Sequence, residues 1–252
     1  MSGDLAGLAA IVTGGSRGIG LAIAELFAGQ GANLVLVARD RARLDAVSAD
    51  IAGKTGHVPI VVSGDAADAR TAESAVAAAL SAFGRLDVLA NVAGWYPTAR
   101  VEQTSDTDFR ATIDSNLHGT FAMCRAAIPA LREAGGAIVN MSSTAARFPT
   151  PGLAAYSASK AGVEAFTRAL AAEVAPDIRV NAVSAGPTMT ESVVELMASD
   201  TTGAVAAVTA NLPLGRLAEP REIAEVFLFL ASCRASVITG QVVHANCGGH
   251  MA

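Results

Sequence analysis

The chain has 252 residues, of which 52% are hydrophobic, and its formal net charge is −5. This length suits one α/β domain over residues 1–252, and the apolar content is enough for a large core. The basic residues form no stripe, which argues against a general nucleic-acid binder, and no apolar run approaches the roughly 18 residues of a membrane span.

The N-terminus and the cysteines both indicate a cytoplasmic protein. Residues 1–4 lack the charged and then apolar layout of a secretory signal. The three cysteines are far apart and form no CxxC pair, which is typical of reduced thiols. Neither they nor the four scattered histidines predict a metal site.

Short apolar runs alternate with helical stretches along the chain. In order they are a strand Leu8–Val12, helix Leu21–Ala28, strand Asn33–Ala38, strand Val58–Val62, helix Thr71–Phe83, strand Leu86–Ala90, helix Asp106–Leu131, strand Ala137–Met141, helix Tyr156–Val174 and strand Ile178–Val183. This order predicts a Rossmann-type, doubly wound parallel sheet of about seven strands with helices on both faces. The helix-like segment Thr188–Leu212 interrupts the rhythm and is expected to cover a ligand crevice.

A glycine-rich turn follows the first strand. Gly14, Gly18 and Gly20 let the backbone turn tightly where a helix begins, and the free N–H groups of a helix N-terminus favour a pyrophosphate. The alternative is a plain strand-to-helix turn. The position after the first strand favours a dinucleotide site.

The end of the second strand indicates which nicotinamide is bound. An acidic residue there would hold the ribose hydroxyl of NAD, whereas an arginine accommodates the additional phosphate of NADP. Here Ala38 takes the place of the acid, Arg39 follows, and Arg17 supplies a second guanidinium. NADP(H) is therefore predicted, with NAD(H) as the second choice. In the alternative, Arg39 begins a solvated helix and pairs with Asp40.

A tyrosine and a lysine share one helix face near the start of the predicted helix Tyr156–Val174. Tyr156 and Lys160 stand four residues apart, and a nearby ammonium group favours the phenolate and lowers the tyrosine pKa. Ser143, at the end of a strand, can donate a hydrogen bond to the oxygen that Tyr156 protonates. Asn116 interrupts the long predicted helix and can bind a water near Lys160.

Taken together, these motifs resemble the short-chain dehydrogenase/reductase family along nearly the whole chain. The resemblance rests on the glycine turn Thr13–Gly20, Asp65, the segment Asn91–Gly94, the four residues Asn116, Ser143, Tyr156 and Lys160, and the turn Gly186–Thr190. The tail from Ile238 to Gly248 is similar to that of 3-oxoacyl-[acyl-carrier-protein] reductases.

The resemblance implies the residues of the site. It implies Asn116, Ser143, Tyr156 and Lys160 as catalytic residues. The cofactor contacts it implies are Gly14, Ser16, Arg17, Gly18, Ile19, Gly20, Arg39, Asp65, Ala66, Asn91, Ala93, Gly94, Tyr156, Lys160, Gly186, Pro187, Thr188 and Thr190. From their positions beside the expected crevice, the candidates for the substrate pocket are Trp95, Tyr96, Phe148, Leu153 and Met189.

The expected function is an NADP(H)-dependent carbonyl reductase or alcohol dehydrogenase that acts on a small-molecule ketone or secondary alcohol, with no nucleic-acid or membrane partner. One alternative is a reductase of 3-oxoacyl thioesters, which needs a basic surface such as Arg100, Arg132 and Arg147 could form. Another is a non-catalytic NADP(H) sensor. Family likeness implies a homotetramer, or a dimer, with contacts through residues 106–131 and 156–174.

Overall fold

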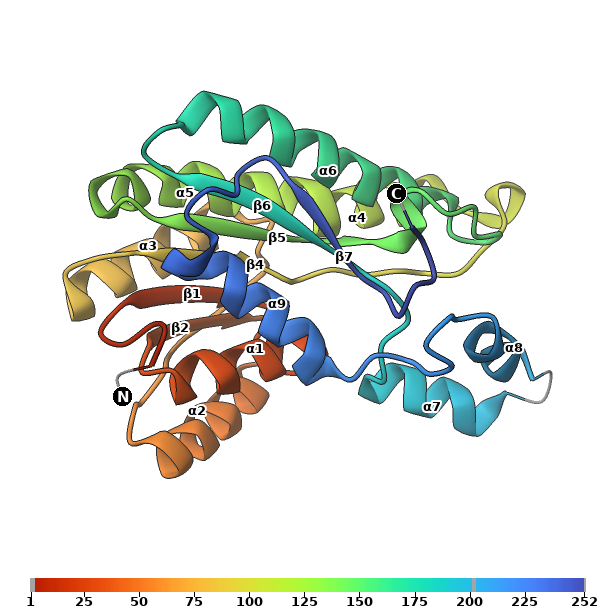
Figure 1. Cartoon of the computed structure of the whole chain (residues 1–252), viewed down its shortest axis with the longest axis horizontal. Coiled ribbons are helices and arrows are strands. Elements are labelled where there is room, and N and C mark those ends of the chain that lie inside the picture. Colours follow the sequence, from red (N-terminus) through yellow and green to blue (C-terminus); the bar gives the residue numbers. More distant parts are fainter. Residues whose placement is uncertain (1–2, 201–202, 252) are drawn as a thin grey trace.

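The computed structural model describes residues 3–200 and 203–251, and its centre is a parallel sheet. The strand order across the sheet is β3-β2-β1-β4-β5-β6-β7 (Figure 1). The strands are β1 (Ala9–Thr13), β2 (Asn33–Ala38), β3 (Ile60–Ser63), β4 (Val88–Asn91), β5 (Ala137–Ser143), β6 (Arg179–Ala185) and β7 (Val242–Ala245). The predicted seven-stranded Rossmann-type sheet is confirmed, and the boundaries of the predicted strands move by only one or two residues.

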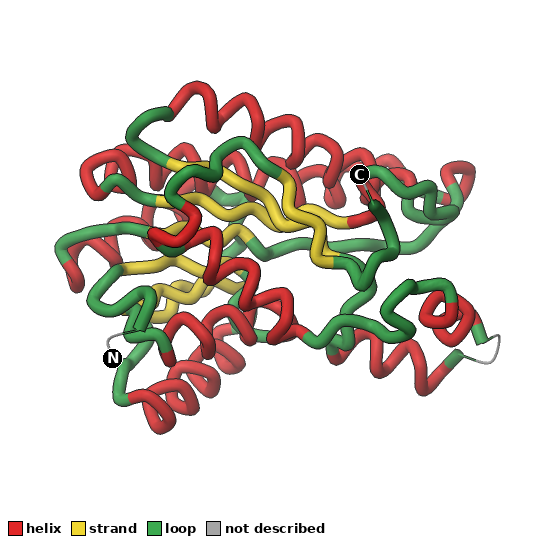
Figure 2. Tube along the Cα trace, viewed as in Figure 1, coloured by secondary structure: helices red, strands yellow, loops and turns green. Residues whose placement is uncertain are grey.

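Helices cover both faces of the sheet, as Figure 2 shows in red around the yellow strands. They are α1 (Gly18–Gly29), α2 (Arg41–Thr55), α3 (Ala69–Phe83), α4 (Asp106–Ile113), α5 (Gly119–Ala134), α6 (Ala154–Val174), α7 (Glu191–Ser199), α8 (Ala204–Ala210) and α9 (Pro220–Ala231). One face carries α1, α2 and α9, and the other carries α3 to α6.

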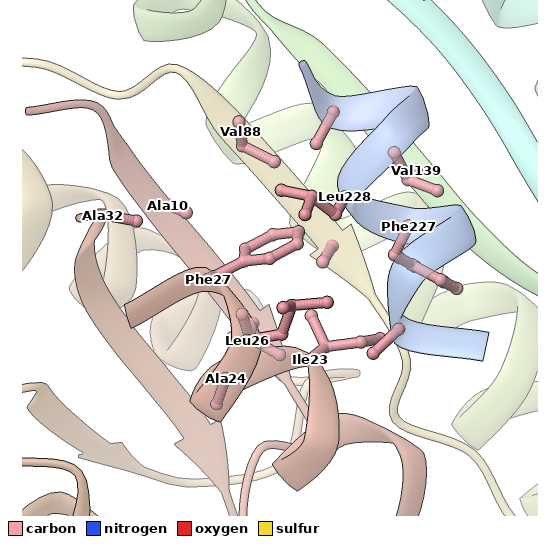
Figure 3. Packing of buried hydrophobic residues seen from close by; sticks show 14 of the residues in the cluster. Ala10, Ile23, Ala24, Leu26, Phe27, Ala32, Val88, Val139, Phe227 and Leu228 are labelled. Atoms are coloured by element: carbon pink, nitrogen blue, oxygen red, sulfur yellow. The ribbon is translucent and has the colours of Figure 1, made fainter. Parts of the chain in front are cut away.

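The strands supply side chains to two cores because neighbouring residues of a strand point to opposite faces. Ala10 and Val12 pack in the core under α1 and α9, whereas Ile11 packs in the core under α3 and α5. Phe27 of α1 and Phe227 of α9 are fully buried in the first of these cores (Figure 3). Burial on both faces explains why the strands read as continuous apolar runs.

The connection from β3 to β4 creates the crevice. The chain proceeds outward from β1 to β2 and β3, then returns to place β4 on the other side of β1. Connections therefore leave the carboxyl ends of β1 and β4 in opposite directions, and an open α/β sheet binds its ligands at such a switch point.

The predicted helix Asp106–Leu131 is not regular. It consists of α4, a π-helical turn at Asp114–His118 and α5. Such a turn inserts one extra residue into the helix and commonly marks a functional position.

The predicted covering segment forms an arm of α7 and α8 that projects beside the sheet (Figure 1). No side chain of α7 is buried. None of the helices in the described part of the chain combines the length and apolar character needed to cross a bilayer.

Candidate functional site

The crevice is braced where β1 and β4 end. The hydroxyl oxygen of Thr13, the last residue of β1, accepts hydrogen bonds from the backbone N–H groups of Val92 and Ala93 at 2.9 and 3.0 Å. Sequence reasoning did not single out Thr13. The sequence signal that could have identified this role is a polar residue at the end of an otherwise apolar strand.

The glycine turn is packed too closely for side chains. A Cβ on Gly20 would lie 2.1 Å from the carbonyl oxygen of Gly14, and a Cβ on Gly14 would lie 3.0 Å from the backbone of Ala93. Gly14 and Gly18 also adopt positive φ angles of 69° and 56°. Glycine is therefore required where the backbone must come close to a ligand.

The N-terminus of α1, which follows this turn, has no protein cap. Arg17 at the N-cap position makes no side-chain capping bond, and the first turn of α1 holds no acidic residue. Its N–H groups and the helix dipole remain available to an anion. Thr190 approaches the same turn, because a Cβ on Gly18 would meet its methyl group at 3.4 Å.

Arg17 in the glycine turn and Arg39 after β2 are both exposed. Within residues 3–200 and 203–251, neither Arg17 nor Arg39 takes part in an ion pair. Asp40 instead caps α2, since its carboxylate accepts from the Arg43 backbone N–H at 3.0 Å. The alternative in which Asp40 neutralises Arg39 is therefore wrong.

Arg39 also borders a pocket of about 360 Å³. The pocket is lined by Arg39, Asp65, Ala67, Trp95, Ala111, Asp114 and Ser115. Asp65 is held in place because its carboxylate accepts from the Ala67 N–H at 3.0 Å. The side chain of Ala66 is buried in the core, so only its backbone can face a ligand.

These features fit an anionic dinucleotide. The uncapped helix can receive the pyrophosphate, and the unpaired guanidinium of Arg39 lies at the pocket edge. Ser16 lies in the glycine turn and Ile19 at the start of α1, and Asn91, Ala93 and Gly94 lie at or just after the end of β4.

The predicted tyrosine–lysine pair is close together on α6. The Nζ atom of Lys160 lies 5.7 Å from the centroid of the Tyr156 ring, which confirms that the two side chains share a helix face. Lys160 is only 2% exposed, and its Nζ donates to the carbonyl oxygen of Met141 at 2.9 Å. Burial lowers the pKa of Lys160 to about 8.

The pKa of Tyr156 does not follow the expectation from the sequence. Burial raises it to about 12, hydrogen bonding by Ser143 opposes the increase, and Tyr96 adds to it. The prediction that Lys160 lowers this pKa is wrong for the protein chain alone, because the loss of water around the phenol outweighs the lysine. The structure does bring Ser143 within hydrogen-bonding reach of Tyr156.

Asn116 lies in the π-helical turn and fastens the segment after β4. Its Nδ2 donates to the Trp95 carbonyl at 2.7 Å, and its Oδ1 accepts from the Trp95 N–H at 3.2 Å. A Cβ on Gly94 would lie 2.5 Å from this Oδ1 and 3.5 Å from the Nζ of Lys160. The backbone of Gly94 thus lies directly beside Asn116 and Lys160.

An ion pair between the buried Glu164 and the exposed Arg147 supports α6 behind these residues. The carboxylate of Glu164 accepts from Arg147 Nε at 2.9 Å and from the Ser142 hydroxyl at 3.1 Å. Glu164 was not predicted as a site residue. The sequence signal that could have identified it is its spacing of four residues from Lys160, which puts both side chains on one face of the helix.

The turn after β6 is fixed by the last strand and by the segment before α9. A Cβ on Gly186 would lie 2.7 Å from Asn246, and the Ala218 N–H donates to the Pro187 carbonyl at 3.1 Å. Thr188 bonds back to Gly186 at 2.9 Å. This places the predicted cofactor turn beside the glycine turn.

The five substrate candidates do not form a single wall. The Tyr96 ring lies 5.8 Å from the Tyr156 ring, and Trp95 and Phe148 are exposed. Leu153 precedes the first residue of α6. Met189 instead lines a pocket of about 240 Å³ with Gly18 and Thr190, next to α1.

Two of the four histidines meet. The rings of His244 and His250 lie 5.1 Å apart, edge to face. Burial is the main cause that lowers the pKa of His244. Among the described residues, no three His, Cys, Asp or Glu side chains are arranged to hold a metal ion.

Comparisons with known proteins agree with this geometry. A family model described as "Enoyl-(Acyl carrier protein) reductase" matches residues 14–250. An uncharacterized oxidoreductase of Methylorubrum extorquens is 40% identical, with 97% of this chain and 98% of that protein covered. A 3-oxoacyl-[acyl-carrier-protein] reductase of Chlamydia muridarum is 36% identical over 98% of this chain and 99% of its own.

A solved structure provides the same comparison in three dimensions. It is L-sorbose reductase from Gluconobacter frateurii, described as complexed with NADPH and L-sorbose. It superposes with a TM-score of 0.91 at 31% identity, and 98% of each chain is covered.

Proposed function

Because the chain belongs to the short-chain dehydrogenase/reductase family and is an oxidoreductase of that type, we propose that it interconverts a ketone and a secondary alcohol with NADP(H). The observation that carries the proposal is the grouping of Tyr156, Ser143 and Lys160 at the crevice beside the uncapped N-terminus of α1. When bound, the nicotinamide supplies or accepts the hydride.

Tyr156 acts as the general acid in reduction. With a pKa of about 12 its phenol is protonated at neutral pH, so it can give its proton to the carbonyl oxygen as that oxygen gains charge. Ser143 donates a hydrogen bond to the same oxygen. In oxidation the same proton travels back to Tyr156.

Lys160 and Asn116 support this transfer. The ammonium group of Lys160 binds the ribose of the cofactor and favours the phenolate that remains after proton transfer. Asn116, already bonded to Trp95 at both backbone atoms, holds the crevice wall and supports a water chain toward Lys160.

Replacing Tyr156 with Phe tests the proton donor. Because this change removes only the hydroxyl, we expect kcat to fall by about 100- to 10,000-fold, with the Kd for NADPH within about twofold of the original value. Stopped-flow absorbance at the NADPH band and fluorescence titration measure the two quantities. Substantial turnover by Tyr156→Phe would contradict the assignment.

Replacing Arg39 with Asp tests the choice of cofactor. The carboxylate repels the additional phosphate and can accept from the ribose hydroxyl, so kcat/KM should shift from NADPH toward NADH by about 100-fold or more. Arg41→Asp is the matched control, because Arg41 makes the same charge change but pairs with Asp45. An unchanged preference for NADPH in Arg39→Asp would remove the argument.

Reduction of 3-oxoacyl thioesters is the second candidate, favoured by the similarity to the Chlamydia muridarum reductase. The structure separates two of the three arginines expected to form a basic surface for a carrier protein. Arg132 pairs with Asp177 where β5 and β6 begin, whereas Arg147 follows the end of β5 and pairs with Glu164. The remaining alternative is a protein that binds NADP(H) as a sensor and catalyses no reaction. NADPH oxidation with any ketone would exclude it.

We also propose that the enzyme is a homotetramer and acts in the cytoplasm. The apolar side chains of Phe109 and Phe121 are exposed on α4 and α5, which supports a subunit contact there. The cysteines Cys124, Cys233 and Cys247 are all free thiols, which suits a reducing compartment.

A further inference from the structure

The only two tyrosines of the chain face each other at the crevice. Tyr96 and Tyr156 have ring centroids 5.8 Å apart and ring planes inclined by 55°. Tyr96 remains 50% exposed. One side of its ring is therefore covered by the catalytic tyrosine, and much of the rest is available to a molecule that enters the crevice.

The segment that carries Tyr96 is fastened on both sides. Before it, Trp95 is bonded through its N–H and its carbonyl to the side chain of Asn116. After it, the Ala99 N–H donates to the Gly152 carbonyl at 2.9 Å. Gly152 also packs against Thr98, because a Cβ there would meet the threonine methyl at 3.1 Å.

This fastening fixes the Tyr96 backbone relative to α6, since Gly152 lies just before that helix. A side chain on such a supported segment loses little further freedom when a ligand binds. Tyr96 is therefore suited to orient a substrate.

The charged groups near the two rings are already engaged. Lys160 donates to Met141, and Arg147 is bonded to Glu164. Burial, Ser143 and Tyr96 are the causes that set the pKa of Tyr156, and no carboxylate contributes. Lys160 is the cation beside Tyr156, and the proposed function assigns it to the ribose of the cofactor. Among the described residues no cation–π contact involves Tyr96, so its ring suits an uncharged part of the substrate.

We propose that Tyr96 is a specificity-determining residue whose exposed ring packs against the ring of an uncharged cyclic ketone or cyclic secondary alcohol, with the reacting oxygen at Tyr156. The inference rests on the proposed function, because it takes Tyr156 as the proton donor. A ring presents a compact and rigid face that an aromatic side chain covers well, whereas a flexible linear ketone loses rotational freedom on the same surface.

The hydroxyl of Tyr96 has a second, separable effect. The electrostatic effect of Tyr96 adds to burial in raising the pKa of Tyr156. Tyr96→Phe keeps the ring and removes this effect. The pH at which the rate of alcohol oxidation rises should then move to a lower value, although the substrate contact is kept.

Two six-carbon ketones test the proposal, cyclohexanone and 2-hexanone, with NADPH as reductant. The natural protein should favour cyclohexanone in kcat/KM by about tenfold or more, and Tyr96→Ala should lose about tenfold on cyclohexanone, the scale of one aromatic contact. The same variant should change by less than about threefold on 2-hexanone. Tyr96→Phe should retain the preference and shift the pH profile of cyclohexanol oxidation downward.

The possible results distinguish a failure of the role of Tyr96 from a failure of the proposed function. Equal losses on both ketones in Tyr96→Ala, or no preference for cyclohexanone in the natural protein, would overturn the role of Tyr96 while leaving the proposed function intact. An unchanged pH profile in Tyr96→Phe would overturn the effect of its hydroxyl. Absence of NADPH oxidation with every ketone in the natural protein would overturn the proposed function and this inference with it.

Discussion

At the scale of single residues, Lys160 is an amine kept in a place that disfavours its charge. It is 2% exposed, its hydrogen bond in the chain goes to a neutral carbonyl, and burial lowers its pKa to about 8. A buried ammonium without a carboxylate partner is costly to the folded state. The residue that we propose to support catalysis is therefore one that weakens the fold.

The cost predicts how stability depends on pH. The folded pKa of Lys160 is about 8 and the unfolded pKa about 10.5, so between these values the unfolded chain binds more protons. The contribution of Lys160 to the unfolding free energy should therefore rise with pH across this window.

Lys160→Met removes the amine and keeps most of its volume. We expect the variant to lose activity but to be more stable at pH 7 by about 1–3 kcal/mol, because a shift of this size is worth about 1.4 kcal/mol per pH unit and the bond to Met141 is lost. Urea denaturation of the natural protein and of the variant, at pH 7 and at pH 10.5, measures their free energies of unfolding. The difference in unfolding free energy between the two proteins should be smaller at pH 10.5. A Lys160→Met protein that is less stable than the natural protein at pH 7 would contradict the prediction.

At the scale of elements, an ion pair links the arm to the opposite side of the crevice. Arg43 of α2 lies 3.3 Å from the carboxylate of Glu191, the first residue of α7, and both side chains are exposed. The pair joins segments 148 residues apart across the side where Thr190 approaches Gly18. It can hold the arm against the dinucleotide site.

Glu191→Gln should loosen this contact. Since an exposed ion pair is worth at most about 1 kcal/mol, we expect NADPH to dissociate about two- to fivefold faster, measured by stopped-flow fluorescence. The difference should disappear in about 1 M salt, where exposed charges are screened. Glu195→Gln is the control, because within the described residues Glu195 makes no ion pair. Equal dissociation rates for both variants would contradict a role for the pair.

The elements also show what sequence reasoning could and could not find. The apolar runs reflect local rules, so β1 to β6 could be predicted to within two residues, whereas α1 begins at Gly18 rather than at the predicted Leu21. The π-helical turn at Asn116 was visible only as a polar interruption. The pairs Arg43–Glu191 and His244–His250 depend on how distant segments come together, and no local pattern carries that information.

At the scale of the whole molecule, a partly exposed aromatic cluster joins α5 and α6 through Phe121 and Phe166. Phe121 is 39% exposed, stacks on His118 at 6.1 Å, meets the edge of Phe166 at 6.3 Å and lies 5.2 Å from the guanidinium of Arg125. An ordered aromatic cluster of this kind on a surface suits contact with another subunit.

Phe121→Glu should therefore reduce the oligomeric state. A carboxylate at the centre of an apolar contact would be buried without a partner, which costs several kcal/mol. Light scattering should show the natural protein at four times the chain mass of 25.3 kDa and the variant as a smaller species. Val58→Glu, at an exposed site before β3, should remain tetrameric. An unchanged mass for Phe121→Glu would contradict the proposed contact.

The packing of Gly186 against Asn246 has a consequence for synthesis on the ribosome. The glycine turn and β1 emerge early, but the turn after β6 gains its full support only when residue 246 has left the exit tunnel. A nascent chain can thus shape the phosphate-binding half of the crevice well before the other half. The ability to transfer hydride should therefore appear only once β7 and residue 246 have folded into place. A tag fused close behind this strand should delay the appearance of activity more than it delays the formation of secondary structure.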